Sequence, residues 1–279
     1  MFFGFLKCRR GPVPALELKR ERVAGKIDPM HQFTVEPLVP LHIGQYDISL
    51  TNSAAWMLAA LAVIGIFMWG GLKRQVVPGR WQMAVEGLTG FIDDLVQVNI
   101  GPEGKKFTPF VFSLFTFILV ANLLGLLPLA VVPGWHPFTP TSHFSITGLL
   151  AIMSFSLVLI IGFWRHGFHF FSLFVPHGTP WYMLPLIIPI EIVSFLVRPF
   201  SLALRLFVAM MSGHILMEVF GSFIVNGFAS GSPVGFGVGA VSFIFIVGVG
   251  ALELLVCALQ AYVFALLTSL YLNDAINLH

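Results

Sequence analysis

Long apolar runs separated by short polar segments make up most of the chain after residue 50. Residues 53–72, 107–132 and 144–164 are each close to the ~20 residues that a helix needs to cross a ~30 Å hydrocarbon core. Two further apolar runs, residues 183–228 and 234–272, are separated by a short Gly/Ser/Pro turn. The pattern predicts five membrane-spanning helices.

The last two apolar runs are too long for perpendicular spans. A helix of about 40 residues extends roughly 60 Å, twice the thickness of the hydrocarbon core. Pro185, Pro189 and Pro199 in the first of them offer places to bend. We expect both helices to be long and steeply tilted.

Residues 80–100 alternate polar and apolar side chains at helical spacing. The apolar set is Met83, Leu88, Phe91, Ile92, Leu95 and Val96, and the polar set is Glu86, Asp93, Asp94 and Gln97. This pattern predicts an amphipathic helix on the membrane surface or against a partner, with the two aspartates on its solvated face. The expected fold is an all-α polytopic membrane protein.

Two regions are expected along the chain. Residues 1–49 are the only long polar part, carry many basic residues and show no cleavable signal, which predicts an extramembrane N-terminal arm. Residues 50–279 form the integral membrane domain. Basic residues then fall in loops on one side of the predicted spans, which places the C-terminus inside and the arm outside. The basic arm itself counts against this orientation. It also favours a bacterial inner (plasma) membrane over a mitochondrial one, as does the absence of a transit peptide.

Composition narrows the function classes. Hydrophobic residues make up 57% of the chain and charged residues 10%, outside the range of soluble domains. The net charge is only +2, and the basic residues are not interleaved with aromatics, so nucleic acid is not an expected partner. Cys8 and Cys257 lie too far apart in the sequence to suggest a disulfide or metal framework, and no cofactor is expected. The lipid bilayer is the partner that the composition predicts.

Arg205 is the most informative residue. It lies inside an apolar run, with no acidic residue within twelve positions on either side. A guanidinium stays protonated, and placing it at bilayer depth costs several kcal/mol unless it faces protein or water. An arginine at this depth is therefore a candidate functional residue.

Other polar residues of the two long segments follow helical spacing. Glu191, Arg198 and Arg205 are seven residues apart and share one stripe. His214 lies about half a turn from that stripe, and Glu218 follows it by four residues. One helix thus presents a cationic face and an opposite titratable face.

On the last helix Glu253 and Gln260 are also seven residues apart and share a side. Proton transfer needs groups such as His214, Glu218 or Glu253, whereas arginine cannot release its proton. Arg205 would instead act as a barrier to protons and as a counter-ion for an acid on a partner.

Several motifs together resemble subunit a of the F-type ATP synthases. They are residues 189–207 (Pro-Ile-Glu-Ile-Val-Ser-Phe-Leu-Val-Arg-Pro-Phe-Ser-Leu-Ala-Leu-Arg-Leu-Phe), Ser212-Gly-His214, Glu253 and Leu259-Gln-Ala-Tyr262. The resemblance extends back through residues 166–177 and 122–128 to residues 28–33. It covers the chain from residue 28 to near the C-terminus.

The resemblance implies a stator subunit that conducts protons through two half-channels to and from the carboxylates of a c-subunit ring, with b-type peripheral stalk subunits as further partners. It implies no catalytic site, because ATP synthesis takes place elsewhere in the complex. Arg205 matches the essential arginine between the half-channels, and Gln260 matches a glutamine that faces it. Glu191 matches an acidic position of the family, and His214 and Glu253 match a pair that many members carry in reverse order. Ala209 departs from the asparagine usual at its position.

Competing interpretations remain for the whole chain and for single residues. A self-contained ion-coupled secondary transporter would usually show an internal repeat, and none is evident. A haem-bearing electron-transfer subunit needs paired deep histidines, and only His214 is deep. Arg198 is interpreted as structural, Glu218 either as a proton-path residue or only as an orienter of His214, and Asn122 as a helix–helix hydrogen bond or a channel residue. A metal site at His166, His169 and His177 is disfavoured, because no Cys or paired acids accompany them.

Overall fold

The computed structural model describes residues 37–39, 42–43, 46–47, 50–71, 79–126, 139–167, 170 and 181–277. Five helices in these residues are long and apolar enough to span a membrane: α2 (Asn52–Gly71), α4 (Thr108–Leu126), α5 (Phe144–His166), α6 (Leu184–Ala229) and α7 (Pro233–Ile276). The prediction of an all-α polytopic membrane protein with five spans is confirmed. The second span is described only to Leu126, short of the predicted end at residue 132.

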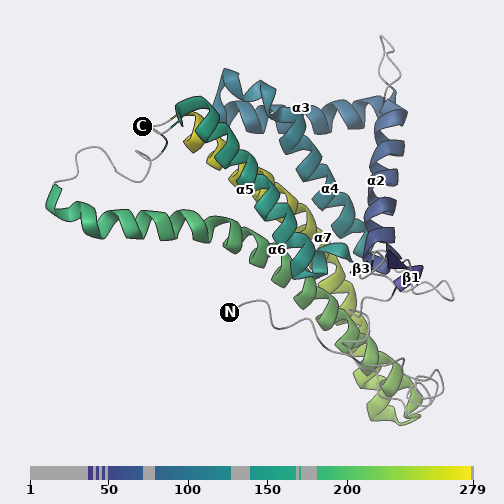
Figure 1. Cartoon of the computed structure of the whole chain (residues 1–279). Coiled ribbons are helices and arrows are strands. Elements are labelled where there is room, and N and C mark those ends of the chain that lie inside the picture. Colours follow the sequence, from purple (N-terminus) through teal and green to yellow (C-terminus); the bar gives the residue numbers. More distant parts are fainter. Residues whose placement is uncertain are drawn as a thin grey trace.

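The amphipathic helix is present with the predicted bounds as α3 (Arg80–Ile100). In Figure 1 it runs across the ends of α2 and α4 at a steep angle to both. Its buried residues are Val85, Ile92, Leu95, Val96 and Ile100. Gly101 ends the helix with a φ of 85°, a conformation that glycine adopts without steric cost.

Both aspartates of α3 were predicted on its solvated face, but Asp93 is only partly exposed. Asp94 is exposed. Asp93 accepts hydrogen bonds from Gln97 Nε2 at 2.6 Å and from Thr108 Oγ1 at 3.1 Å. Thr108 begins α4, so this carboxylate ties the surface helix to the following span.

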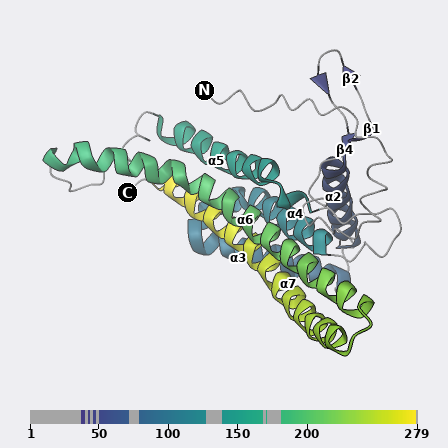
Figure 2. The same ribbon diagram turned by 90° about the horizontal axis from the view of Figure 1, so that it is seen from below.

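Helices α6 and α7 lie side by side as a long hairpin (Figures 1 and 2). With 46 and 44 residues, they extend roughly 65–70 Å. Pro189 and Pro199 lie inside α6. Figure 1 shows that α6 bends between its first part and the part that runs alongside α7. The prediction that both helices are long is confirmed. The bend expected from the prolines is present in α6.

Glycines bring the two helices together at the turn of the hairpin. A Cβ added at Gly227 would lie 2.7 Å from the carbonyl oxygen of Gly235 and 3.0 Å from the nitrogen of Gly239. Such close approach of two backbones is possible only without side chains. Ser232 then caps α7, because its Oγ accepts a hydrogen bond from the Gly235 N–H at 3.0 Å.

The tightest packing lies where α4, α5, α6 and α7 meet. Fully buried side chains there include Ile118, Val158, Leu206, Met210 and Phe264. Many large apolar side chains of α6 and α7 point outward instead. Lipid tails are as apolar as a protein core, so these outward faces suit a membrane or another membrane protein.

Among the residues that the structure describes before α2, there are four short strands, which were not predicted. β1 (Pro37–Val39) pairs antiparallel with β4 (Leu50–Thr51), and β2 (His42–Ile43) pairs with β3 (Tyr46–Asp47). Segments of two or three residues are too short to show a period-two pattern in the sequence. Most of the predicted N-terminal arm, including all its basic residues, lies outside the described residues.

Several chain segments meet at one edge of the molecule. Arg165, in the last turn of α5, contacts Glu103 of η2 (Pro102–Lys106) at 2.5 Å. His166 Nε2 lies 3.0 Å from the carbonyl oxygen of Ile276, which ends α7. Lys105, Lys106 and Arg165 therefore share an edge with the C-terminal end of α7. Lys73 and Arg74, predicted on the same side, lie outside the described residues.

These contacts also bear on the histidines considered as metal ligands. His166 contacts the backbone of α7, and His169 and His177 lie outside the described residues. Within the part of the chain that the structure describes, no cluster of three or more potential metal-binding side chains is found.

Candidate functional site

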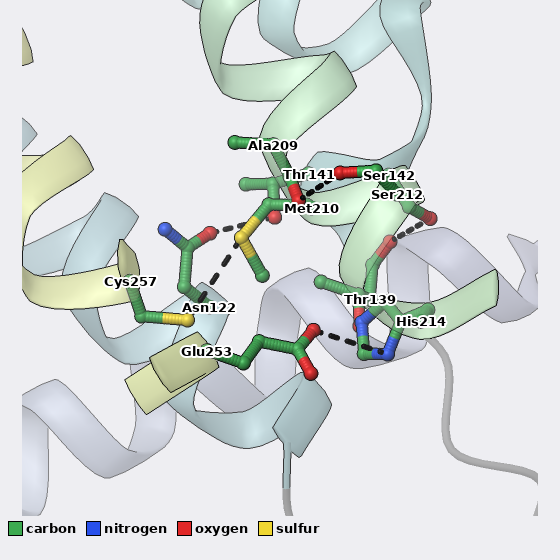
Figure 3. A network of polar contacts seen from close by, with 10 residues as sticks. All are labelled: Asn122, Thr139, Thr141, Ser142, Ala209, Met210, Ser212, His214, Glu253 and Cys257. Carbon is green, nitrogen blue, oxygen red and sulfur yellow. Dashed lines mark hydrogen bonds and ion pairs between the residues drawn. The ribbon is translucent and has the colours of Figure 1, made fainter. Parts of the chain in front are cut away.

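Of the titratable residues predicted on α6 and α7, His214 and Glu253 meet, at a level where α4 and the segment around η4 (Pro140–Ser142) also converge. Figure 3 shows Glu253 of α7 directed at His214 of α6. Nδ1 of His214 lies 3.7 Å from Oε1 of Glu253. The side chains are 12% and 3% exposed. Two titratable groups are thus held together inside the protein.

The other ring nitrogen of His214 has a partner that the sequence did not indicate. Nε2 lies 2.6 Å from Oγ1 of Thr139, just before η4. Glu218, one helical turn beyond His214, is half-buried. The polar contacts found for His214 in the described residues are with Thr139 and Glu253, and a pairing with Glu218 stays a prediction.

Glu253 occupies space that a glycine leaves free. A Cβ at Gly213 would lie 2.6 Å from Oε1 and 2.7 Å from Cδ of Glu253. Among the described residues neither carboxylate oxygen has a hydrogen-bond partner. A buried carboxylate without hydrogen bonds costs several kcal/mol when charged, so its charge depends strongly on the neighbouring imidazole or on water.

A second polar contact lies beside this pair. Oδ1 of Asn122 in α4 accepts a hydrogen bond from Oγ1 of Thr141 at 2.7 Å, and Asn122 is fully buried. Its Nδ2 has no hydrogen-bond partner among the described residues. Among the described residues Asn122 therefore bonds to η4 and not to another spanning helix.

Arg205 lies in the middle of α6 and is exposed, on the side away from His214. Among the described residues it has no salt-bridge partner. Its guanidinium is near enough to the hydroxyl of Tyr271 in α7 to interact electrostatically. The side chain of Gln260 is buried on α7, on the same helix as Glu253, and no hydrogen bond between Gln260 and Arg205 is found in the described chain.

Arg198, seven residues before Arg205, is paired. Nη1 donates to Oδ2 of Asp274 at 3.0 Å, and Nη2 lies 4.0 Å from Oε1 of Glu191. The guanidinium also lies over the Tyr271 ring, 5.3 Å from its centroid. The contacts agree with a structural role for Arg198 and place Glu191 with it.

Ala209, which departs from the usual asparagine, contributes only its backbone to the recorded hydrogen bonds. Its carbonyl oxygen accepts from Oγ of Ser212 at 3.1 Å (Figure 3). The methyl side chain offers no polar contact at this position.

Three important positions were missed in the sequence. Thr139 lies in a loop, Gly213 has no functional group, and Asp274 lies near the C-terminus, beyond the predicted end of the last helix. Asp274 carried one signal, since it is an acidic residue two positions beyond residue 272, where the last span was predicted to end. Gly213 stands in the motif Ser212-Gly-His214, but neither it nor Thr139 carried a signal of its contact, because both contacts join segments distant in sequence.

The chain matches the family described as ATP synthase A chain over residues 54–273. It is 63% identical over 259 residues to "ATP synthase subunit a" of Erythrobacter litoralis, covering 92% of this chain and 98% of the relative. The protein of the same name in Rhizorhabdus wittichii is 64% identical over 258 residues, with the same coverage. That of Rhodospirillum rubrum is 44% identical over 252 residues, covering 90% of this chain and 99% of the relative. The chain therefore belongs to the ATP synthase A chain family.

Proposed function

We propose that this chain is the stator of the membrane sector of a rotary F-type ATP synthase. It conducts protons through two half-channels to and from carboxylates on a c-subunit ring, and so couples proton translocation to ATP synthesis made elsewhere in the complex. The chain itself has no catalytic hydrolytic site in this proposal. A bacterial inner membrane is its location.

The observation that carries the proposal is the exposed Arg205 in the middle of α6. A cation at bilayer depth costs about 2.5–3.5 kcal/mol or more if it faces lipid. A carboxylate on a neighbouring membrane subunit removes this cost, because the opposite charge favours ionisation of the acid as it arrives. The same acid becomes neutral again when it moves on into lipid. Arg205 thus separates two places where the acid gains and loses its proton.

The buried pair behind Arg205 supports a route for protons. His214 and Glu253 lie in contact on the opposite side of α6 and both exchange protons. In this proposal they belong to one half-channel, with Glu218 further along it. Glu191 lies on the other side of the Arg205 level, beside Arg198, and is assigned to the second half-channel. Gln260 supports the rotor-facing region as a buried polar group on α7.

The outer surfaces of the helices support the proposed partners. The apolar outer faces of α6 and α7 suit the c-subunit ring. The exposed face of α3 includes Trp81, Met83 and Val98, and it suits b-type peripheral stalk subunits at the membrane surface. The edge that carries Lys105, Lys106 and Arg165 faces the cytoplasm, as basic loops generally do.

The test is the substitution Arg205→Ala in membranes that contain the assembled complex. We expect loss of ATP-driven proton pumping and of proton-driven ATP synthesis, because no cation then separates the half-channels. Arg165→Ala is the control, since it removes a guanidinium that is already paired within the chain, with Glu103, and that lies outside α6 and α7. It should retain coupling. Coupled synthesis in the Arg205→Ala complex would contradict the proposal, and ion transport by the purified chain alone would favour the secondary transporter.

A further inference from the structure

The hydrogen bond between Thr139 and His214 joins two segments 75 residues apart in sequence. Its length, 2.6 Å between Oγ1 and Nε2, is at the short end for such contacts. Thr139 is 4% exposed. The hydroxyl therefore contacts the ring nitrogen that points away from Glu253, inside the protein.

The surroundings of Thr139 fix its position. Gly125 of α4 leaves no room for a Cβ, because such an atom would overlap Oγ1 and the rest of the Thr139 side chain. The carbonyl oxygen of Thr139 accepts a hydrogen bond from Oγ of Ser142 at 2.7 Å. The next turn is tied to α4 by the bond from Thr141 to Asn122 at 2.7 Å. The side chain is seated against α4 and aimed at α6.

A hydroxyl is suited to a ring that changes its protonation state. It donates through its hydrogen and accepts through its oxygen lone pairs. When Nε2 of His214 carries no hydrogen, the hydroxyl donates to it. When Nε2 carries a hydrogen, in the other neutral tautomer or in the imidazolium, the hydroxyl accepts. Only a rotation about the Cβ–Oγ bond separates these two arrangements.

We propose that Thr139 is a positioning residue that keeps Nδ1 of His214 aimed at Glu253 in every protonation state of the ring. The inference rests on the proposed proton-conducting function. In the exchange that it supports, the O–H bond of a protonated Glu253 breaks and an N–H bond forms at Nδ1. A neutral pair becomes an imidazolium beside a carboxylate, with Nε2–H donating to Thr139 throughout. No further reactant is needed.

The experiment compares Thr139→Val, Thr139→Ser and wild type in membranes containing the assembled complex. Valine has nearly the shape of threonine without the hydroxyl, and serine keeps the hydroxyl without the methyl group. Thr116→Val is the matched control, because this buried threonine of α4 donates only to the carbonyl oxygen of Phe112 in its own helix, at 2.8 Å. ATP-driven proton pumping is measured per assembled complex over a range of pH.

We expect Thr139→Val to slow pumping about three- to tenfold, the effect of one hydrogen bond on a rate. Its pH profile should differ from that of wild type, because the ring loses a partner that suits both protonation states. The titratable groups nearest this ring are Glu253 on α7, Glu218 on α6 and His143 at the end of η4, and all three are unchanged. Thr139→Ser should restore rate and profile, and the control should resemble wild type.

Two outcomes with the Thr139 variants would overturn the inference. One is a Thr139→Val complex with wild-type rate and profile, and the other is an equal loss in the valine and serine variants, which would assign the effect to the methyl group. If Thr139→Val reduces assembly, Gly125→Ala provides the second variant, since the added Cβ displaces the hydroxyl while keeping it chemically intact. Its pH profile should change in the same way, and an unchanged profile would overturn the inference. Loss of coupling in Arg205→Ala stays a separate result, so failure here leaves the proposed function standing.

Discussion

Alanine in place of Gly213 tests how closely α6 and α7 approach beside the His214–Glu253 pair. The added Cβ would lie 2.6 Å from Oε1 and 2.7 Å from Cδ of Glu253, whereas non-bonded carbon atoms need about 3.5 Å or more. The carboxylate must therefore move by about 1 Å, since α7 packs along the whole of this part of α6. The 3.7 Å separation between the two titratable groups then changes by a comparable amount.

A misplacement of about 1 Å can reduce the rate of a positioned reaction up to roughly a hundredfold. We expect ATP-driven pumping in the Gly213→Ala complex to fall about tenfold to a hundredfold. The substitution also overpacks a helix interface, which costs about 1–3 kcal/mol of stability. Rates are therefore measured per assembled complex, by fluorescence quenching in inverted membrane vesicles together with the amount of chain that copurifies with the other subunits.

Gly221→Ala is the matched control in the same helix. A Cβ at Gly221 meets no atom within 4 Å, and alanine favours an α-helix by about 1 kcal/mol over glycine. This variant should assemble and pump like wild type. If Gly213→Ala pumps as fast as Gly221→Ala, the contact between the Gly213 backbone and Glu253 does not govern proton transfer, and the reasoning fails.

Two predictions concern the edge of the molecule. Asp274→Asn should lower the free energy of unfolding of the detergent-solubilised chain by only about 0.5–1 kcal/mol, because the ion pair with α6 is 29% and 43% exposed; a loss several times larger in thermal unfolding would refute this estimate. The hydrogen bond from Arg165 and its charge hold the pKa of Glu103 below its ordinary value of 4.5, so the stabilisation is fully present above pH 4.5 and is lost as the pH falls through the lower folded value. Glu103→Gln should remove this acid dependence from thermal unfolding curves, and added salt should weaken it in wild type.

The helices were predictable because each carries a strong periodic or apolar signal. An apolar run of about 20 residues has few alternatives to a spanning helix, and the bounds of α3 agree with the predicted 80–100. The paired short strands before α2 had no comparable signal. The role of Asp93 was also misjudged, because its bond to Thr108 depends on how α3 meets α4.

Most residues of the candidate site were predictable from the sequence, but spacing alone did not predict which of them contact each other. The spacing on α6 separated Arg205 from His214, and the structure has one exposed and the other turned inward. The register between α6 and α7 decides which acid reaches His214, and no local pattern encodes that register. Spacing alone pointed to Glu218 as the partner, whereas the family resemblance paired His214 with Glu253, and the structure brings these two side chains together. Thr139 required the path of a loop as well.

Close contacts join α6 and α7 toward both ends of the hairpin, so the pair resists bending more than a single helix does. At the turn, Gly227 lies directly against the backbone of Gly235 and Gly239. Toward the other end, Arg198 is bonded to Asp274. A sideways force on Arg205, which lies between these two contacts and nearer to Arg198, would be carried by both helices together. A pair of helices joined in this way bends far less than either alone, so a sideways load would displace the arginine less than it would on a single helix.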